Sequence, residues 1–375
     1  MFPVEHCNSQ ENLWRVKSIN SLDLNSLLKV ELFFKTHFPN VFDTDKIKEV
    51  LKWKIGPDNP AGQGYAHVAV NESDEVIGVA TATKRKVISI PGTVMAVEVG
   101  DTFTAPNYRK SGCCSTRLGE IFKFSDFLDE NYLGASVFGR LMYETLSQAR
   151  DAGVHIAFGT PNNLSKPAYL KRFDFHEALA TQLCSLYLLG EVGTENASTT
   201  SQVQKIYLNL VKKLIKTKQN VFKNISPESW IAECLGGTSS VVQQKTLLFK
   251  DYEFYNHRYV KHPVNKYSFH KMELPKAPPI YFIVRHKSNG DKQVVEVVGD
   301  LNCIKLFKIL VYCQELINKK QKVLMWYRLN KRARITLLVL GILVVPNVSI
   351  IIKDLTRNQS FPDFNYFGIG DSDNG

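Results

Sequence analysis

The seven cysteines are the residues of this sequence with the widest chemical range, from nucleophilic catalysis to zinc binding. They form no CxxC pair and have no Cys/His spacing of the kind that holds zinc, so the sequence predicts no metal site. Cys113 and Cys114 lie beside basic residues, which lower a thiol pKa. No paired histidine is identifiable near them, so nucleophilic catalysis is the less favoured hypothesis. An odd number of cysteines is typical of reduced thiols, and we expect a cytoplasmic protein.

The charge balance indicates an anionic partner. Lys and Arg outnumber Asp and Glu by 47 to 36, which suits a nucleotide cofactor, a nucleic acid or an acidic membrane surface. A basic soluble protein with no such partner is the alternative. The length of 375 residues predicts two domains, and the 44% hydrophobic composition is typical of folded proteins. Charged and polar residues in the first twenty positions argue against a secretory signal.

One segment, Ile335–Ile352, has the apolar character of a membrane span and follows a basic run. Pro346 and Asn347 divide it, and neither part reaches the roughly 20 residues that a spanning helix needs. We therefore expect a buried helix followed by a buried strand rather than a membrane anchor, and no integral membrane span.

Hydrophobic periodicity predicts a β-rich start followed by helix, strand, helix and strand in the first half. Ser21 or Asp23 can cap the first helix. The predicted helices cover Ser21–Phe38, Asp43–Lys54, Ala135–Ala152 and a short segment at 165–173. The predicted strands cover Tyr65–Val70, Glu75–Thr83, Val94–Thr104, His155–Asn163 and Thr181–Leu189.

A polar stretch, Gly190–Gln204, is typical of a domain boundary. The helix predicted next, Val203–Lys216, is basic and amphipathic, and a solvated face is favoured over a membrane or tRNA contact. The second half repeats the order of the first, starting from a hairpin of Tyr281–Arg285 and Gln293–Val298. The sequence thus predicts an α/β fold in two copies, each a central mixed sheet flanked by helices. The predicted divisions are a first domain at 1–190, a linker and helical connector at 191–244, and a second domain at 245–375.

A basic, glycine-containing turn follows the strand that ends at Thr104. The segment reads GDTFTAPNYRKSG, and after a helix comes FGTPNNLSKPAYLKRFDF. This arrangement resembles the cofactor-binding core of GCN5-related N-acetyltransferases (GNAT), in which the motif Q/R-x-x-G-x-G/A joins the fourth strand to the third helix. The resemblance implies that backbone N–H groups of this turn hold the pyrophosphate of CoA. Arg109, Lys110, Ser111 and Gly112 match the first four positions.

The sequence departs from this motif at its sixth position, where Cys114 replaces Gly or Ala. The residues from 113 to 133 then intervene before the helix resumes. Gly134, Ala135 and Ser136 supply small residues that can complete the turn. The alternative is that the insertion destroys the phosphate site and the domain has lost activity.

Acyl transfer from a thioester to an amine needs a base for the amine and a group that polarises the thioester carbonyl. The resemblance places a backbone N–H of Phe103 or Thr104 at the carbonyl. It makes Glu98 and Asp101 the candidate bases. Strand alternation is expected to send these two carboxylates to opposite faces, and Asp101 is favoured because it lies nearer the strand end. Alternatively, Asp101 only caps the loop.

The leaving thiolate also needs a proton donor. Many members of the family use a tyrosine five residues before the last aromatic of the short helix. Leu170 holds that place here, counted from Phe175, and Tyr169 lies one residue earlier. Tyr169 is therefore a candidate acid or a packing aromatic. Asn162 and Asn163 are expected to hydrogen-bond the pantetheine arm or the last strand.

The resemblance implies an acyltransferase that uses acetyl-CoA or another acyl-CoA, without a metal. Its acceptor would be a primary amine of a small molecule, such as an amino sugar.

Lys250–Phe269 looks like a segment of tandem GNAT-like proteins, a group that includes peptidyltransferases acting on aminoacyl-tRNA, so tRNA is an alternative partner. Gly370–Gly375 resembles the tail of bacterial two-domain acyltransferases. The second half lacks the R-x-x-G motif, and we expect it to be non-catalytic; a GNAT-like binding protein without activity is the third hypothesis. The oligomeric state is not indicated.

Overall fold

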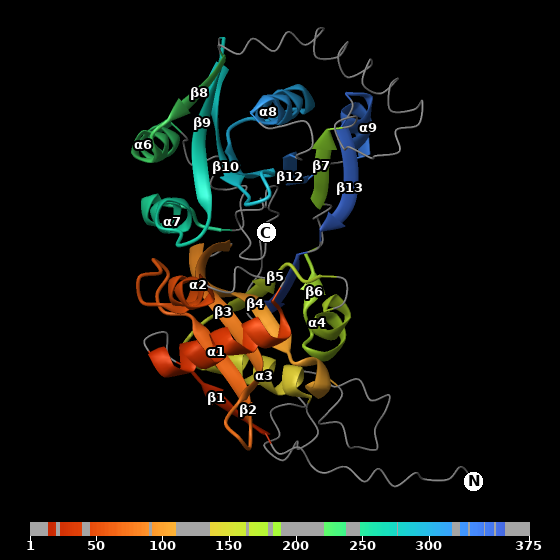
Figure 1. The fold of residues 1–375 in the computed structure, drawn as a ribbon. Coiled ribbons are helices and arrows are strands. Elements are labelled where there is room, and N and C mark those ends of the chain that lie inside the picture. Colours follow the sequence, from red (N-terminus) through yellow and green to blue (C-terminus); the bar gives the residue numbers. More distant parts are fainter. Residues whose placement is uncertain are drawn as a thin grey trace, which may run out of the picture.

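The computed structural model describes most of the chain. The described residues are 14–19, 23–39, 46–89, 92–109, 136–162, 165–178, 183–188, 221–237, 248–275, 277–316, 323–328, 331–340, 342–348 and 350–356. They form two seven-stranded sheets with flanking helices, one above the other in Figure 1. The predicted α/β class and the two copies of one architecture are confirmed.

The first sheet has the strand order β1-β2-β3-β4-β5-β14-β6. Its strands are β1 (Trp14–Ser18), β2 (Tyr65–Asn71), β3 (Val76–Ser89), β4 (Gly92–Thr104), β5 (Ile156–Gly159), β14 (Ile351–Asp354) and β6 (His176–Glu177). The pairing of β4 with β5 is parallel, and the other pairings of this sheet are antiparallel. The sheet is therefore mixed, as predicted.

Helices cover both faces of the first sheet, because alternate strand residues point to opposite faces. Ala66, Val68 and Val70 of β2 pack with α1 (Leu24–His37) and α2 (Ile47–Ile55). Tyr65 and Ala69 pack instead with α3 (Val137–Asp151), and α4 (Lys166–Arg172) adds Tyr169 to the same cluster. Asp23 caps α1 by accepting a hydrogen bond from the backbone N–H of Ser26 at 3.2 Å.

The second sheet has the order β13-β7-β12-β11-β10-β9-β8. Its strands are β13 (Ile342–Val348), β7 (Leu183–Leu188), β12 (Val323–Arg328), β11 (Lys292–Val298), β10 (Ala277–His286), β9 (Lys266–Leu274) and β8 (Phe222–Ile225). Buried residues of α8 (Cys303–Glu315) and α9 (Lys331–Val339) pack on one face. The other face packs against α6 (Pro227–Gly237), α7 (Tyr252–Tyr255) and a π-helical turn, Asn256–Val260.

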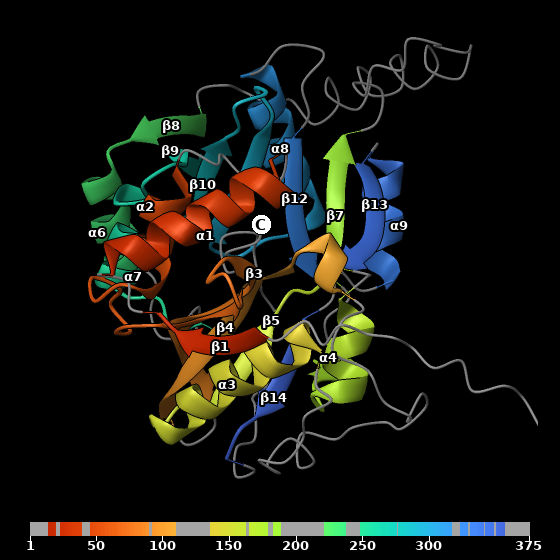
Figure 2. The same ribbon diagram turned by 60° about the horizontal axis from the view of Figure 1, so that its bottom comes forward.

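Each sheet contains one strand from the other half of the chain. β7 lies between β13 and β12, where Ser185 pairs with Val345 on one side and Trp326 on the other. β14 lies between β5 and β6, where Ile351 pairs with Gly159 and Glu177. Figure 1 shows the yellow-green β7 in the upper sheet, and Figure 2 shows the blue β14 among elements of the first half. The prediction that Thr181–Leu189 is the last strand of the first half is therefore wrong, and a cut at residue 190 leaves neither sheet complete.

The apolar segment Ile335–Ile352 also differs from its prediction. It forms the end of α9 and then β13 and β14, which belong to different sheets, instead of one helix and one strand. Part of its surface is exposed rather than buried. None of the helices in the described part of the chain has the length and hydropathy of a membrane span. The helix predicted at Val203–Lys216 lies outside the described residues.

The two halves share a core. The Trp53 ring of α2 stacks on the His257 ring, with centroids 5.0 Å apart, and its Nε1 donates to the His257 carbonyl at 3.0 Å. The Arg258 guanidinium lies 5.3 Å from the Trp53 ring. Phe158 of β5 belongs to the same buried cluster as Trp230 of α6. The halves are thus packed as one unit through apolar and aromatic contacts.

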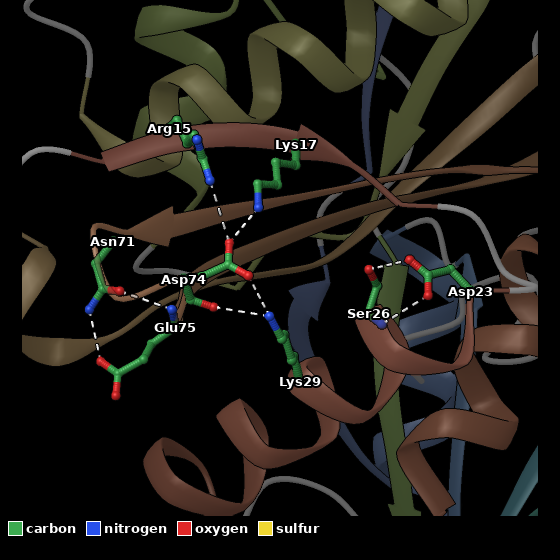
Figure 3. A network of polar contacts seen from close by, with 8 residues as sticks. All are labelled: Arg15, Lys17, Asp23, Ser26, Lys29, Asn71, Asp74 and Glu75. Carbon is green, nitrogen blue, oxygen red and sulfur yellow. Dashed lines mark hydrogen bonds and ion pairs between the residues drawn. The ribbon is translucent and has the colours of Figure 1, made fainter.

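The carboxylate of Asp74, in the turn between β2 and β3, contacts basic side chains of β1 and α1 (Figure 3). Asp74 has a φ of 59°, and Lys17 of β1 and Lys29 of α1 both donate to its carboxylate. Arg15 adds an ion pair at 3.7 Å. The hydrogen bonds from Lys17 and Lys29 hold the pKa of Asp74 well below its usual value of 3.8. The turn, β1 and α1 are therefore joined at one point.

This lowered pKa predicts an acid-sensitive contribution to stability. The folded-state pKa is depressed, so the contribution is full above pH 3.8 and is lost as the pH falls through the folded-state value. In Asp74→Asn, whose asparagine tolerates a positive φ, the free energy of unfolding should fall at pH 7 and depend less on pH below 4. Urea unfolding between pH 2 and 7 measures both. Equal pH dependence in the variant and the wild type would contradict the assignment.

Candidate active site

A bulge interrupts β4 at the predicted site. Thr81 of β3 pairs with Gly100, but Val79 pairs with Phe103, so Asp101 and Thr102 together face one β3 position. Asp101 has a φ of 43°, in the left-handed region that non-glycine residues rarely adopt. The bulge therefore lies at the predicted base Asp101 and directly before Phe103 and Thr104, the residues predicted to polarise the thioester carbonyl.

The bent end of β4 has an open edge toward β5. The parallel pairing covers only Ala96–Glu98 with Ile156–Phe158. At Gly159, where β5 ends, a Cβ atom would lie 2.8 Å from Val99 Cγ2, so only glycine allows this close approach. Beyond it, no described strand pairs with Gly100–Thr104 on the β5 side. The Gly100 carbonyl accepts hydrogen bonds from Thr81 Oγ1 and Thr102 Oγ1, and the Thr104 carbonyl accepts one from Arg109 Nε.

The start of α3 lies at the end of β4. Ser136 caps the helix by accepting a hydrogen bond from the Gly139 N–H at 3.1 Å. A Cβ on Gly78 of β3 would lie 2.7 Å from Val137 Cγ1 and 3.2 Å from the Phe103 carbonyl oxygen, so these groups crowd around one point. The first turn of a helix is a site for anions, because its N–H groups lack helical partners. The predicted small residue Ser136 is thus next to the predicted β4 residues.

Tyr169 reaches the bulge from α4. Its hydroxyl lies 3.5 Å from Thr102 Oγ1 and 3.8 Å from the Met142 sulfur of α3. Burial raises the pKa of Tyr169 to about 12, while the hydrogen bond with Thr102 works in the opposite direction. The ring also contacts Phe138 and Phe175 edge-on. Tyr169 is therefore a packing aromatic whose protonated hydroxyl lies at the bulge, and its role as an acid stays a prediction.

Both candidate bases are in buried ion pairs. Asp101 accepts from Lys54 of α2 at 2.5 Å and from Thr81 Oγ1 at 3.5 Å. Glu98 accepts from Arg85 at 3.2 Å. Thr81 and Arg85 lie on the same face of β3, because their spacing is even and the register between them is regular. The expectation that the two carboxylates lie on opposite faces is therefore wrong: the bulge shifts the alternation by one residue.

The buried Lys54–Asp101 pair predicts a large and non-additive effect on stability. Asp101→Asn leaves the Lys54 ammonium buried without its countercharge, and we expect a loss of about 3–5 kcal/mol in unfolding free energy. The double variant Lys54→Met/Asp101→Asn should recover part of this loss. Denaturant unfolding of both single variants and the double variant measures the coupling. Additive losses would show that the pair is not coupled.

Three other predicted residues have mainly structural contacts. The Phe103 ring packs edge-on against Phe34 and Phe38. Arg109 Nε donates to the Thr104 carbonyl at 3.2 Å. The Asn162 side chain accepts from the Ser165 N–H at 2.9 Å at the start of α4.

The Thr104 hydroxyl is different, because it is buried and has no hydrogen-bond partner among the described residues. A buried polar atom of this kind suits a ligand. The remaining predicted residues, Lys110, Ser111, Gly112, Gly134, Ala135 and Asn163, lie outside the described residues, as do Cys113 and Cys114.

Sequence reasoning missed Thr102, Met142 and Lys54, which complete the environment of Tyr169 and Asp101. The pair Gly100–Asp101 in the middle of a strand was the available signal, because such residues often mark a bulge. Burial raises the pKa of each cysteine in the described segments, which makes these thiols poor nucleophiles. The described residues contain no group of three or more potential metal ligands of the His, Cys, Asp and Glu types.

No known protein-family profile and no curated protein matches this chain. Solved structures do match. A conserved protein of unknown function from Enterococcus faecalis V583, described as a probable N-acyltransferase, has a TM-score of 0.53 at 12% identity over 92% of this chain and 73% of its own. A GCN5-related N-acetyltransferase from Kribbella flavida has a TM-score of 0.51 at 15% identity, covering 92% and 72%.

The N-myristoyltransferase of Saccharomyces cerevisiae, with bound myristoyl-CoA and inhibitors, matches over the longest span of these three. Its TM-score is 0.53 at 11% identity, and the match covers 98% of this chain and 87% of that enzyme. At these identities the likeness is one of fold. Residues from both halves contribute to it.

Proposed function

From its fold, which is that of GCN5-related N-acetyltransferases in two copies, we propose that this protein is an acyl-CoA-dependent N-acyltransferase. The observation that supports this best is the open edge of β4 at the Asp101–Thr102 bulge, with the start of α3 and the Tyr169 hydroxyl beside it. An extended thioester chain fits such an edge. The Thr104 hydroxyl at its end, which has no hydrogen-bond partner among the described residues, is a donor for that chain.

Each part of the site has a proposed role. The start of α3, capped by Ser136, is proposed to hold the pyrophosphate of CoA together with Arg109 and with Lys110, Ser111 and Gly112, which lie outside the described residues. A backbone N–H of Phe103 or Thr104 polarises the thioester carbonyl. Tyr169 donates a proton to the leaving thiolate, because its raised pKa keeps the hydroxyl protonated.

Asp101 is the proposed base for the acceptor amine, ahead of Glu98. It lies at the bulge next to Thr102, whereas Glu98 lies three residues earlier, where β4 is still paired with β5. Its carboxylate is ion-paired with Lys54 of α2, which holds it in place at the bulge.

The proposed reaction moves an acetyl or similar acyl group to a primary amine of a small molecule such as an amino sugar. Use of aminoacyl-tRNA, or binding without catalysis, are the alternatives. A non-catalytic role for the second domain and a cytoplasmic location are also proposals.

Calorimetric titration with acetyl-CoA and longer acyl-CoAs tests the co-substrate, and a thiol assay for released CoA with a panel of amines tests the reaction. We expect binding of at least one acyl-CoA and amine-dependent release of CoA. Absence of binding at millimolar concentration of every acyl-CoA would overturn the proposal. Binding of tRNA that weakens steeply with salt would favour the tRNA-dependent alternative instead.

A further inference from the structure

Five side chains of the second half are hydrogen-bonded in a row that runs from the surface into the core. Lys292 Nζ of β11 lies 3.0 Å from His286 Nδ1 of β10, and His286 Nε2 lies 2.8 Å from Ser268 Oγ of β9. Ser268 Oγ lies 2.7 Å from His270 Nε2, and His270 Nδ1 lies 3.3 Å from the Tyr312 hydroxyl of α8. We call these five residues the histidine network. His286 is exposed, whereas His270 is 3% and Lys292 8% exposed.

The strand register explains why these residues meet. His286 and Lys292 are the last pair of the β10–β11 hairpin, and Lys266 of β9 pairs with His286 on its other side. Ser268 and His270 follow Lys266 at even spacing, so they share a face of β9, and this is the face that α8 covers. The network therefore joins the open end of the hairpin to the neighbouring strand and to the helix.

The positions of the protons follow from the lysine, which can only donate. Lysine is more basic than imidazole, so its ammonium donates to His286 Nδ1, which must be unprotonated. The ring proton of neutral His286 is then on Nε2 and is donated to Ser268 Oγ. Ser268 has no further partner among the described residues, so its hydroxyl donates to His270 Nε2, and His270 Nδ1 donates to Tyr312. Every donor has an acceptor only while both imidazoles are neutral.

Basic groups surround the exposed end of the network. Lys292 and Lys266 pair with His286 from the two neighbouring strands, and like charges at paired positions are destabilising. Lys287 follows His286 in the sequence and interacts with Asp291, the one acidic residue of the hairpin turn. No carboxylate in the described part of the chain forms an ion pair with Lys292 or Lys266. A further positive charge on His286 would therefore have no countercharge beside it.

The buried end of the network also disfavours charge. Burial raises the pKa of Tyr312 and raises that of Cys313, beside it on α8, to about 12, so neither group is negative at pH 7. Burial and the nearby Lys292 lower the pKa of His286 below its usual value of 6.5. Burial, Lys292 and His286 lower the pKa of His270 to about 4. Both imidazoles are thus neutral at pH 7, as the proton positions require.

We propose that the histidine network is a pH-sensitive latch, which holds the open end of the β10–β11 hairpin on β9 and α8 at neutral pH and releases it in acid. A second proton on His286 goes to Nδ1 and points at the Lys292 ammonium 3.0 Å away. Two cationic donors then face each other without an acceptor, so the pair that closes the hairpin separates. This separation exposes Ser268 and gives water access to His270.

The pH effect has a defined sign. The folded-state pKa values of His286 and His270 lie below the unfolded value of 6.5, so the stabilisation is complete above pH 6.5 and is lost as the pH falls from there through the folded-state values. His67 of β2 is a comparison within the same chain. Its pKa is also lowered to about 4 by burial, but its one hydrogen-bond partner among the described residues is Thr145 of α3, at 3.0 Å. The first half therefore has a buried histidine without a latch.

Hydrogen exchange of the full chain, measured by mass spectrometry and corrected for the intrinsic effect of pH, tests the proposal. We expect peptides over 266–270 and 286–292 to exchange at least about tenfold faster at pH 5 than at pH 7.5, whereas peptides of β2 and α3 change less. His286→Gln removes the titrating ring and should make exchange of the latch peptides independent of pH. Lys292→Met removes the opposing ammonium and should reduce the pH effect. The matched control is His176→Gln on β6, an exposed strand histidine whose loss should leave the effect unchanged.

Three results would overturn the proposal. The latch peptides of the wild-type chain exchange equally at both pH values, or His286→Gln keeps the wild-type pH effect, or the peptides of β2 and α3 respond as strongly as those of the latch. The last result would assign the acid response to unfolding of the whole chain. The first and third need no variant, so the proposal stays testable if a substitution prevents folding, which circular dichroism of each variant detects.

Discussion

A chain that ends before Ile350 is expected to lose its fold, although it lacks only β14 and the residues that follow. β14 lies between β5 and β6 and is hydrogen-bonded to both. Its removal therefore leaves β6 without its neighbour in the first sheet and exposes the edge of β5. Ile350 and Ile352 are buried in the core shared by the two halves, and Ile351 is buried beneath α3. Each buried isoleucine contributes about 1.5–3 kcal/mol, so the loss approaches the whole stability of a typical domain.

The measurement is the yield of soluble chain and its thermal unfolding by circular dichroism. A chain that ends after Thr356 is the matched control, because it keeps every described residue of β14 and should unfold as the wild type does. The separate fragment 1–190 is likewise expected not to fold. A chain ending at residue 349 with a normal unfolding transition would show that β14 is dispensable.

Tyr169→Phe is expected to lower kcat by about 100-fold or more while leaving acyl-CoA binding nearly unchanged. The substitution removes the hydroxyl at 3.5 Å from Thr102 Oγ1 and keeps the ring that packs against Phe138 and Phe175. Because the pKa of Tyr169 is raised to about 12, the wild-type hydroxyl stays protonated through the neutral and mildly alkaline range.

Steady-state kinetics and acyl-CoA titration of the same preparation separate kcat from binding. Tyr252→Phe is the matched control: Tyr252 is 47% exposed on α7, and its hydroxyl has no proposed role. Wild-type turnover in Tyr169→Phe would exclude the hydroxyl as the acid and leave Tyr169 as a packing residue only. Thermal unfolding identifies a variant that is inactive because it is unfolded.

The order of elements was predictable because it depends on local periodicity. Apolar spacing and a polar cap located α1 and its start at Asp23, and the run before Gly153 located α3. The hairpin signals at Tyr65–Thr83 and Tyr281–Val298 correspond to β2–β3 and β10–β11. These patterns depend on residues a few positions apart in the sequence, so they predict the type of each element. They do not indicate which strand will pair with which.

The strand exchange was not predictable for the same reason. β7 is a short strand, and nothing in its periodicity selects β12 and β13 of the second half as its neighbours. The prediction of Ile335–Ile352 failed because an apolar run does not show where one strand ends and a second begins. The division into strands of two different sheets depends on contacts with β5 and β7, which are distant in the sequence.

The site shows the same division between local and tertiary information. The sequence by itself determined the residue types at the end of β4, the small residue Ser136 that starts α3, and the presence of Tyr169 near the short helix. Only the tertiary structure decided that Asp101 adopts a positive φ, pairs with Lys54 of α2 and lies on the same face as Glu98. The bulge at Asp101 and Thr102 changes the direction of the side chains that follow it by one residue of the alternation. The unusual φ of Asp101 is stabilised by contacts with residues that are distant in the sequence, such as Lys54, and these contacts form only on folding.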